Sequence, residues 1–159
     1  MELISAPQTE VALVLRLVLA ALLGAAVGAN REMRLKPAGL RTHALVAVGA
    51  ALLAVISLAM TRPGVTADFN PASRILQGIV AGIGFIGGGV ILRRDDPRGV
   101  HGLSTAASIW VVAAVGTAAG FGLWRAAIAT VVLALLLLSL GRPIDRKLRT
   151  LGADDDPDA

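Results

Sequence analysis

The chain has 159 residues, of which 55% are hydrophobic, and a formal net charge of +4 at pH 7. It contains no cysteine, which excludes disulfides, thiolate metal sites and cysteine nucleophiles. The apolar residues fall in runs of about twenty, the length that an α-helix needs to cross a bilayer. The basic residues cluster at the ends of these runs, where lipid head groups explain them better than nucleic acid does. We therefore predict a single-domain, all-α, polytopic membrane bundle that binds no nucleic acid.

The N-terminal segment carries Glu2 and Glu10 but no basic residue, unlike a cleaved signal peptide. We therefore expect the first span, residues 11–29, to be retained. Arg16 lies within this span, and we interpret it as a side chain that snorkels to the head groups, with a functional role as the alternative. Gly24 and Gly28, at the other end of the span, form a GxxxG helix-packing pattern.

Five spans are predicted, over residues 11–29, 42–60, 74–92, 103–119 and 123–140. The last two are divided at Gly120-Phe121-Gly122, because paired glycines mark a turn and one continuous helix would be too long for a bilayer. Basic residues concentrate after the first, third and fifth spans. The positive-inside rule therefore predicts an outside N-terminus and a cytoplasmic C-terminus.

The third span holds six glycines in nineteen residues. In a bilayer, small residues let neighbouring helices approach backbone to backbone. At about 100° per residue the glycines form two stripes, and Arg74 and Gln77 project on the side of the second. We therefore predict that this span is the central helix of the bundle and that its glycines serve helix packing or a partner. The first stripe is Gly78, Gly82 and Gly89, and the second is Gly84, Gly87 and Gly88.

Polar residues gather at the predicted cytoplasmic mouth of the bundle. Tight turns there would lead into the second and fourth spans, with a hydroxyl group capping the start of the fourth. Free N–H groups at these helix starts, beside arginines, would attract an anion; alternatively, the caps and arginines only anchor the helices. The candidate residues are Asn30, Arg31, Arg41, Thr42, His43, His101, Ser104 and Thr105.

Metal binding and catalysis are both disfavoured. His43 and His101 have no cysteine or acidic residue beside them, so we interpret both as interfacial. Ser104 and His101 lack the elbow, orienting carboxylate and oxyanion motif of a serine hydrolase. We expect no enzymatic activity, no metal and no cofactor. None of the five predicted spans contains Asp or Glu, which counts against a cation transporter, although backbone carbonyls near the glycines could still line a path.

The membrane domain is predicted to cover residues 1–142, because Arg142-Pro143 should end the fifth span. Residues 143–159 then form a short basic amphipathic helix on the inner leaflet and an acidic tail. No soluble C-terminal domain is expected.

Three blocks together resemble the MgtC/SapB family of bacterial membrane proteins. They are residues 24–50 with AGLRTH, residues 70–92 with GIGFIG, and residues 100–120 with GLSTAA. The resemblance implies a five-span inner-membrane domain, a link to low magnesium and virulence, and regulation of another membrane complex such as ATP synthase or an ion-transport ATPase. The family motifs fall on Arg31, residues 39–43, Arg74, Gly82, Gly84, Phe85, Gly87, residues 102–106 and Trp110.

Two positions depart from the family pattern. Asn30 stands where the family usually has Glu, and Asn70 stands where Asp usually precedes the arginine of the third span. If those acids bind ions or pair with arginine, this chain lacks that step. The expected partners are membrane lipids, a membrane protein and further copies of the chain. The alternative function is a small channel or transporter for Mg²⁺ or an anion.

Overall fold

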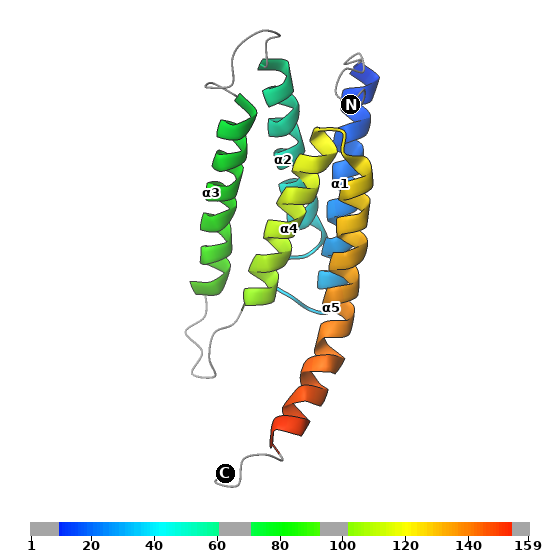
Figure 1. Cartoon of the computed structure of the whole chain (residues 1–159), viewed down its shortest axis with the longest axis vertical. Helices are drawn as coiled ribbons and strands as arrows, with labels where there is room; N and C mark the ends of the chain where they lie inside the picture. The colour runs from blue at the N-terminus through cyan, green and yellow to red at the C-terminus, as the bar shows by residue number, and fades with distance from the viewer. Residues whose placement is uncertain (1–9, 61–70, 93–101, 154–159) are drawn as a thin grey trace.

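The computed structural model describes residues 10–60, 71–92 and 102–153, and these ranges form five α-helices without a strand. Figure 1 shows the helices side by side along the long axis of the molecule. The predicted all-α bundle is therefore confirmed. The helices are α1 (Glu10–Met33), α2 (Leu40–Met60), α3 (Pro71–Leu92), α4 (Leu103–Gly120) and α5 (Trp124–Ala153).

Four of these helices, α1 to α4, are long and apolar enough to cross a membrane. The apolar part of α5, Trp124–Leu140, is shorter and lies at the lower end of the length that spans a bilayer. The protein is thus a membrane protein by the length and composition of its helices.

The centre of the bundle is α4, and the prediction that α3 is central is wrong. α4 contacts all four other described helices, whereas α3 contacts only α2 and α4. More than half of the α4 span is buried (56%), against 11% of the α3 span. Figure 1 shows α3 at one edge of the molecule. The glycines of α3 therefore leave a helix surface open instead of filling the middle of the bundle.

Two GxxxG pairs outside α3 permit a close approach of neighbouring helix backbones. A Cβ atom added to Gly24 of α1 would lie 2.6 Å from the carbonyl oxygen of His43, and one added to Gly28 would lie 2.6 Å from the Leu40 Cα. The corresponding pair on α4, Gly116 and Gly120, packs against the backbone of α2. The predicted packing role of the first pair is confirmed, and the second pair explains why α4 sits so close to α2.

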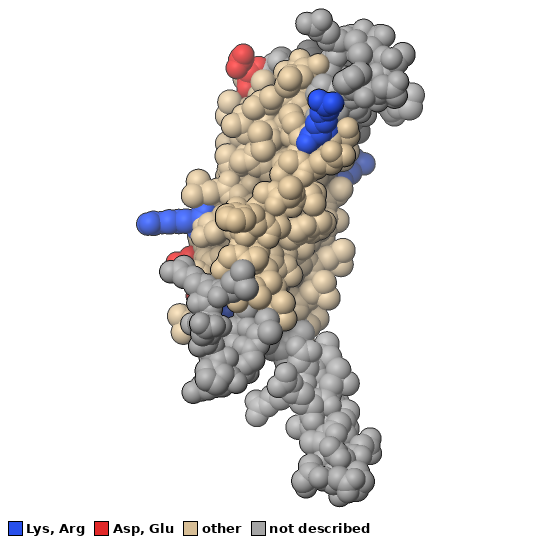
Figure 2. Space-filling model, turned by 90° about the vertical axis from the view of Figure 1, so that its left-hand side faces the viewer, with Lys and Arg blue, Asp and Glu red and all other residues tan. Residues whose placement is uncertain are grey.

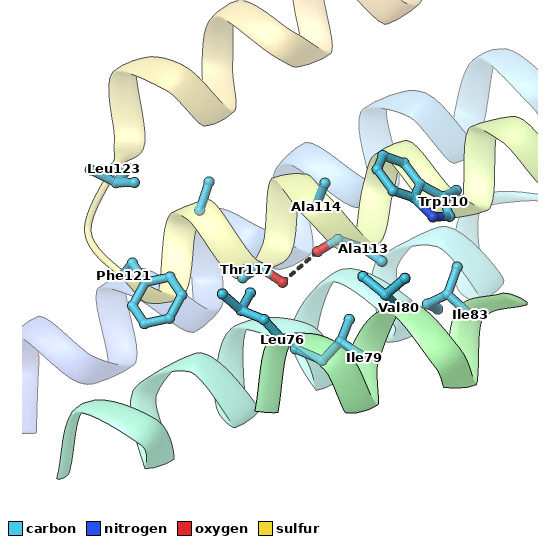
Figure 3. A pocket seen from close by; sticks show the side chains of 11 residues that line it. Leu76, Ile79, Val80, Ile83, Trp110, Ala113, Ala114, Thr117, Phe121 and Leu123 are labelled. Carbon is cyan, nitrogen blue, oxygen red and sulfur yellow. Dashed lines mark hydrogen bonds between the residues drawn. The ribbon is translucent and has the colours of Figure 1, made fainter. Parts of the chain in front are cut away.

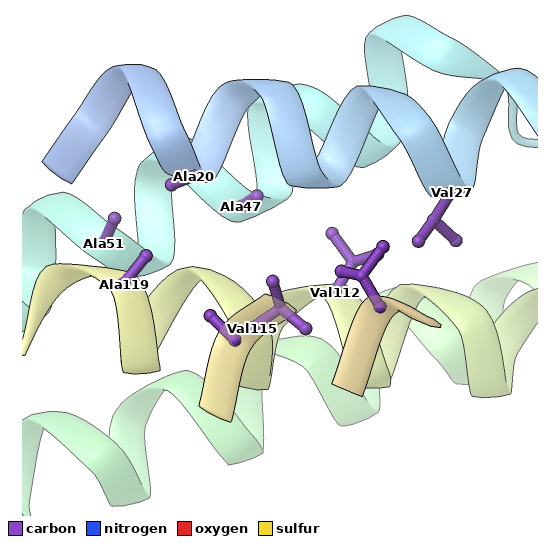
Figure 4. Packing of buried hydrophobic residues seen from close by; sticks show 9 residues of the cluster. Ala20, Val27, Ala47, Ala51, Val112, Val115 and Ala119 are labelled. Atoms are coloured by element: carbon purple, nitrogen blue, oxygen red, sulfur yellow. The ribbon is translucent and has the colours of Figure 1, made fainter. Parts of the chain in front are cut away.

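The core between α1, α2, α4 and α5 consists of small and β-branched side chains (Figure 4). Ala20 of α1 and Ala47 of α2 are fully buried, as is Val112 of α4. Alanines at the crossings leave room for close contact, and valines fill the space between crossings. The complete cluster is Ala20, Val27, Ala47, Ala51, Val112, Val115, Ala119, Ala127 and Val131.

The division between α4 and α5 falls at the predicted glycines. Gly122 has a positive φ of 81°, the Gly122 N–H donates to the Ala119 carbonyl, and the Leu123 N–H donates to the Ala118 carbonyl. This is the Schellman arrangement, which ends a helix on a left-handed residue, usually glycine. Arg16 Nη1 of α1 donates to the Gly120 carbonyl at 3.1 Å. Arg16 therefore binds the C-terminal end of α4, a role that the snorkelling interpretation missed.

The fifth helix does not end at Pro143. α5 continues to Ala153, so the expected break after Arg142 is wrong. A proline within a helix removes one hydrogen bond and bends the axis without necessarily stopping the helix. Figure 1 shows the last part of α5 inclined to the rest. The proposed contact of this part with the inner leaflet stays a prediction.

Candidate functional site

The site lies where α1 ends and where α2 and α4 begin. The connection between α1 and α2 is a tight turn in which Leu35 has a positive φ of 52° and the Lys36 N–H donates to the Arg31 carbonyl. Glu32 Oε2 accepts a hydrogen bond from the Leu40 N–H at 2.8 Å. Because a carboxylate of the chain itself caps α2, the anion-site alternative is not supported at this helix start.

Arg31 is buried between α1 and α4, with 3% of its surface exposed. Its Nη2 donates to the Thr105 hydroxyl at 2.6 Å and to the Ser104 hydroxyl at 3.3 Å. A buried guanidinium needs hydrogen-bond acceptors, and two adjacent hydroxyl groups on the first turn of α4 provide them. This contact joins three predicted site residues that are about seventy positions apart in the chain.

His43 is fully buried and connects α2 to α4. Its Nδ1 lies 2.9 Å from the Gly39 carbonyl oxygen, so we assign the Nδ1 proton to this bond. Its Nε2 lies 3.0 Å from the Ser108 hydroxyl oxygen, which also lies 2.8 Å from the Thr105 carbonyl oxygen, so the single hydroxyl proton has two neighbouring acceptors. We call Arg31, His43, Ser104, Thr105 and Ser108 the polar cluster. It joins α1 and α2 to the start of α4.

The start of α4 differs from the prediction of a hydroxyl cap. Gly102, with a φ of 89°, is the N-cap residue and provides no side-chain cap for α4. The backbone N–H groups of Thr105 and Ala106 donate to the Gly102 carbonyl. The Ser104 and Thr105 hydroxyls are engaged by Arg31 instead.

The remaining predicted site residues lie outside the polar cluster. Asn30 Nδ2 donates to the Ser139 hydroxyl of α5 at 3.4 Å. Arg41 and Thr42 are exposed at the start of α2. Arg74 and Gln77 are exposed on α3, and Trp110 is half exposed on α4. Asn70 and His101 lie outside the described residues.

The α3 glycines separate into one that packs and five that face open space. Gly87 lies against Ala106, where an added Cβ would be 3.6 Å from the Ala106 Cβ. A Cβ added at any of the other five would meet nothing within 4 Å in the part of the chain that is described; these are Gly78, Gly82, Gly84, Gly88 and Gly89. Their role toward a partner therefore stays a prediction.

Two residues of the site escaped the sequence analysis. Ser108 follows Ser104 by four positions, so helical spacing alone would have placed both on one face of α4. Glu32 lies beyond the predicted end of the first span, because α1 runs four residues further, to Met33 instead of residue 29. Among the described residues, no group of three His, Cys, Asp or Glu side chains could hold a metal ion.

A cavity of about 550 Å³ adjoins the polar cluster. Thr42 and the buried Ile109 contribute to its wall, and Gly89 of α3 lies on the opposite side. The cavity is lined by Pro37, Ala38, Thr42, Ile86, Gly89, Val90 and Ile109. It separates the end of α3 from the turn that precedes α2.

This arrangement defines a small helical membrane protein with a buried arginine–histidine–hydroxyl cluster at one end of its bundle. The chain belongs to the MgtC family, which matches residues 17–147. It is 42% identical to protein SrpB of Synechococcus elongatus, over 87% of this chain and 80% of that protein. It is 42% identical to the putative magnesium transporter YhiD of Escherichia coli K12, over 80% of this chain and 59% of that protein.

Protein MgtC of Salmonella typhimurium is 41% identical, over 87% of this chain and 56% of that protein. The chain thus spans little more than half the length of the Escherichia coli and Salmonella relatives. No solved structure matches the chain. The resemblance seen in the sequence is therefore confirmed, and every residue of the polar cluster lies within the matched range.

Proposed function

We propose that this protein is a non-enzymatic, multi-pass inner-membrane protein that regulates another membrane complex during adaptation to low magnesium. Membership of the MgtC family supports the link to magnesium, as does the name of the Escherichia coli relative. The complex that we propose is of the ATP synthase or ion-transport ATPase type, as the family resemblance implies.

The observation that carries this proposal is the open glycine stripe of α3. At about 100° per residue, Gly78 and Gly82 lie on the side of α3 turned away from Leu76 and Ile83, which line the groove toward α4, and a Cβ added at either glycine would meet nothing within 4 Å. Figure 2 looks onto the α3 side, where uncharged surface dominates and the described charged side chains lie toward the upper end and the margins. Such a surface lets a partner helix approach the α3 backbone closely within the membrane.

The burial of the polar cluster supports a non-enzymatic role. Ser108 and His43 lie within hydrogen-bond distance, but they expose 4% and 0% of their surfaces. The Nδ1 of His43 is bonded to a backbone carbonyl rather than to an orienting carboxylate. A nucleophile needs access to its substrate and an activated base, and this pair is buried between helices.

The test is in-membrane crosslinking with affinity purification at low and high magnesium, comparing wild type with Gly82→Leu. Gly49→Leu is the matched control, because a Cβ at Gly49 of α2 also meets nothing within 4 Å. We expect a stoichiometric membrane-protein partner in wild type and in Gly49→Leu, and its loss in Gly82→Leu. Equal recovery of the partner in all three proteins would refute the role of the α3 stripe.

The second candidate function is a small channel or carrier, and the cavity beside Thr42 and Gly89 favours it. A bulky side chain at Gly89 would enter this cavity. In proteoliposomes, a channel would give Mg²⁺ or anion flux in wild type and reduced flux in Gly89→Leu. If no tested ion gave flux while partner binding was intact, the channel function would be refuted and the regulatory function would be the one candidate left.

A further inference from the structure

An apolar groove of about 320 Å³ separates α3 from α4 at the end of the bundle opposite the polar cluster (Figure 3). One wall is formed by Leu76, Ile79, Val80 and Ile83 of α3. The floor consists of small residues of α4, among them Ala114. The groove is thus present because bulky residues of α3 face a row of small residues on α4.

The lining of the groove is almost entirely apolar and contains no charged side chain. Apart from the indole N–H of Trp110, its one polar side-chain group is the Thr117 hydroxyl, which donates to the Ala113 carbonyl of the same helix at 2.9 Å. Figure 3 shows this bond within the floor of the groove. The ligand that suits this lining is a hydrocarbon, because a hydrocarbon has no polar group that would lose its hydrogen bonds on burial.

The length of the groove corresponds to one leaflet of a bilayer. Trp110 lies near the middle of α4, and Phe121 lies eleven residues later, directly after the helix ends. At about 1.5 Å per residue this distance is about 16 Å, roughly half of the ~30 Å hydrocarbon core. Just beyond the groove, the Arg125 guanidinium stacks 4.9 Å from the Trp124 ring centre, a pairing suited to the level of the head groups.

We propose that this groove binds one acyl chain of a phospholipid from the adjacent leaflet. The groove runs for about 16 Å along α4 and its lining holds no charged side chain, which suits a single hydrocarbon chain. The bound chain completes the contact between α3 and α4. At the opposite end Gly87 packs directly against Ala106, whereas along the groove the two helices leave apolar side chains without partners.

The first experiment is native mass spectrometry of the full chain purified in detergent. Wild type is expected to retain one phospholipid per chain. Ala114→Leu fills the floor of the groove and should lower the lipid-bound fraction at least tenfold. Ala81→Leu is the matched control, because Ala81 is an exposed residue of α3 that does not line the groove. If Ala114→Leu is not monodisperse, Val80→Phe fills the same groove from the peripheral helix.

The second experiment uses the chain's two tryptophans. Trp124→Phe leaves Trp110, which lines the groove, as the sole tryptophan. Titration of this delipidated protein with dibromostearoyl phosphatidylglycerol should give saturable quenching that Ala114→Leu abolishes and Ala81→Leu preserves. Unchanged lipid retention and quenching in both groove-filling variants would overturn the proposal. Crosslinking of Trp110 to a second copy would overturn it as well, because the groove would then hold protein.

Discussion

At the scale of single residues, two buried polar side chains form hydrogen bonds between helices. Arg31 reaches hydroxyls on α4, and His43 reaches Ser108 of the same helix. Groups of this kind are costly to bury unless their hydrogen bonds are made, so the positions of α1, α2 and α4 are coupled at the cluster.

A pair of threonine substitutions on α4 tests this coupling. Thr105 and Thr117 are both buried, but Thr105 accepts from Arg31 whereas Thr117 bonds within its own helix. Thr105→Val should lower the free energy of unfolding by about 1–2 kcal/mol, because it removes an acceptor from a buried cation. Thr117→Val should lower the free energy of unfolding clearly less than Thr105→Val does. Denaturation in mixed micelles measures both, and equal losses would contradict the role of the Arg31 bond.

Arg16 offers a second test at this scale. Its guanidinium donates to the last carbonyl of α4, where the negative end of the helix dipole lies. Arg16→Met keeps an unbranched apolar stem and removes the guanidinium donors, so we expect a loss of about 1 kcal/mol in the free energy of unfolding. Arg125→Met is the control, because Arg125 is an exposed residue stacked on Trp124. A thermal shift as small as that of the control would show that the bond contributes nothing.

At the scale of helices, the glycines fall into two groups that the sequence does not distinguish. Gly116 is in contact with the backbone of α2, and Gly49 of α2 itself faces open space. The same residue type therefore permits close packing in one place and leaves an open surface in another. Only the neighbouring helix decides between these roles.

Alanine substitutions separate the two groups. Gly116→Ala places a methyl group against the Ala47 backbone and should destabilise the bundle by more than 1 kcal/mol, since overpacking typically costs about 1–3 kcal/mol. Gly49→Ala should be neutral or stabilising by up to about 1 kcal/mol, because alanine favours a helix over glycine. Thermal unfolding of the detergent-purified proteins measures the difference. Equal melting temperatures would argue against close α2–α4 packing.

At the scale of the whole molecule, the number of crossings depends on α5. Four helices are long enough to cross, and the apolar part of α5 is shorter. Five crossings place the termini on opposite sides of the membrane, and four place them on the same side. The distribution of basic residues predicts five, with the C-terminus in the cytoplasm.

The absence of cysteine makes this topology directly measurable. Glu10→Cys and Asp156→Cys each introduce one thiol, near opposite ends of the chain. A membrane-impermeant maleimide should label the first in intact spheroplasts and the second only after lysis. Labelling of both thiols before lysis would indicate four crossings with both ends outside. Labelling of the second thiol alone would indicate the reverse orientation.

The sequence by itself determined the properties that depend on local composition. Apolar runs of membrane length predicted the helices, glycines marked the turn between α4 and α5, and the combination of three motifs indicated the MgtC family. It also identified Arg31, His43, Ser104 and Thr105 as candidates. Their residue types and their positions at helix ends can be read from the sequence alone.

Only the tertiary structure decided which helix is central and what the polar residues contact. Glycine density pointed to α3, but α4 is buried because its small residues meet neighbours on several sides. Ser108 became part of the site because α2 places His43 against it. Contacts between helices depend on which faces meet, and neither helical periodicity nor composition specifies a helix's neighbours.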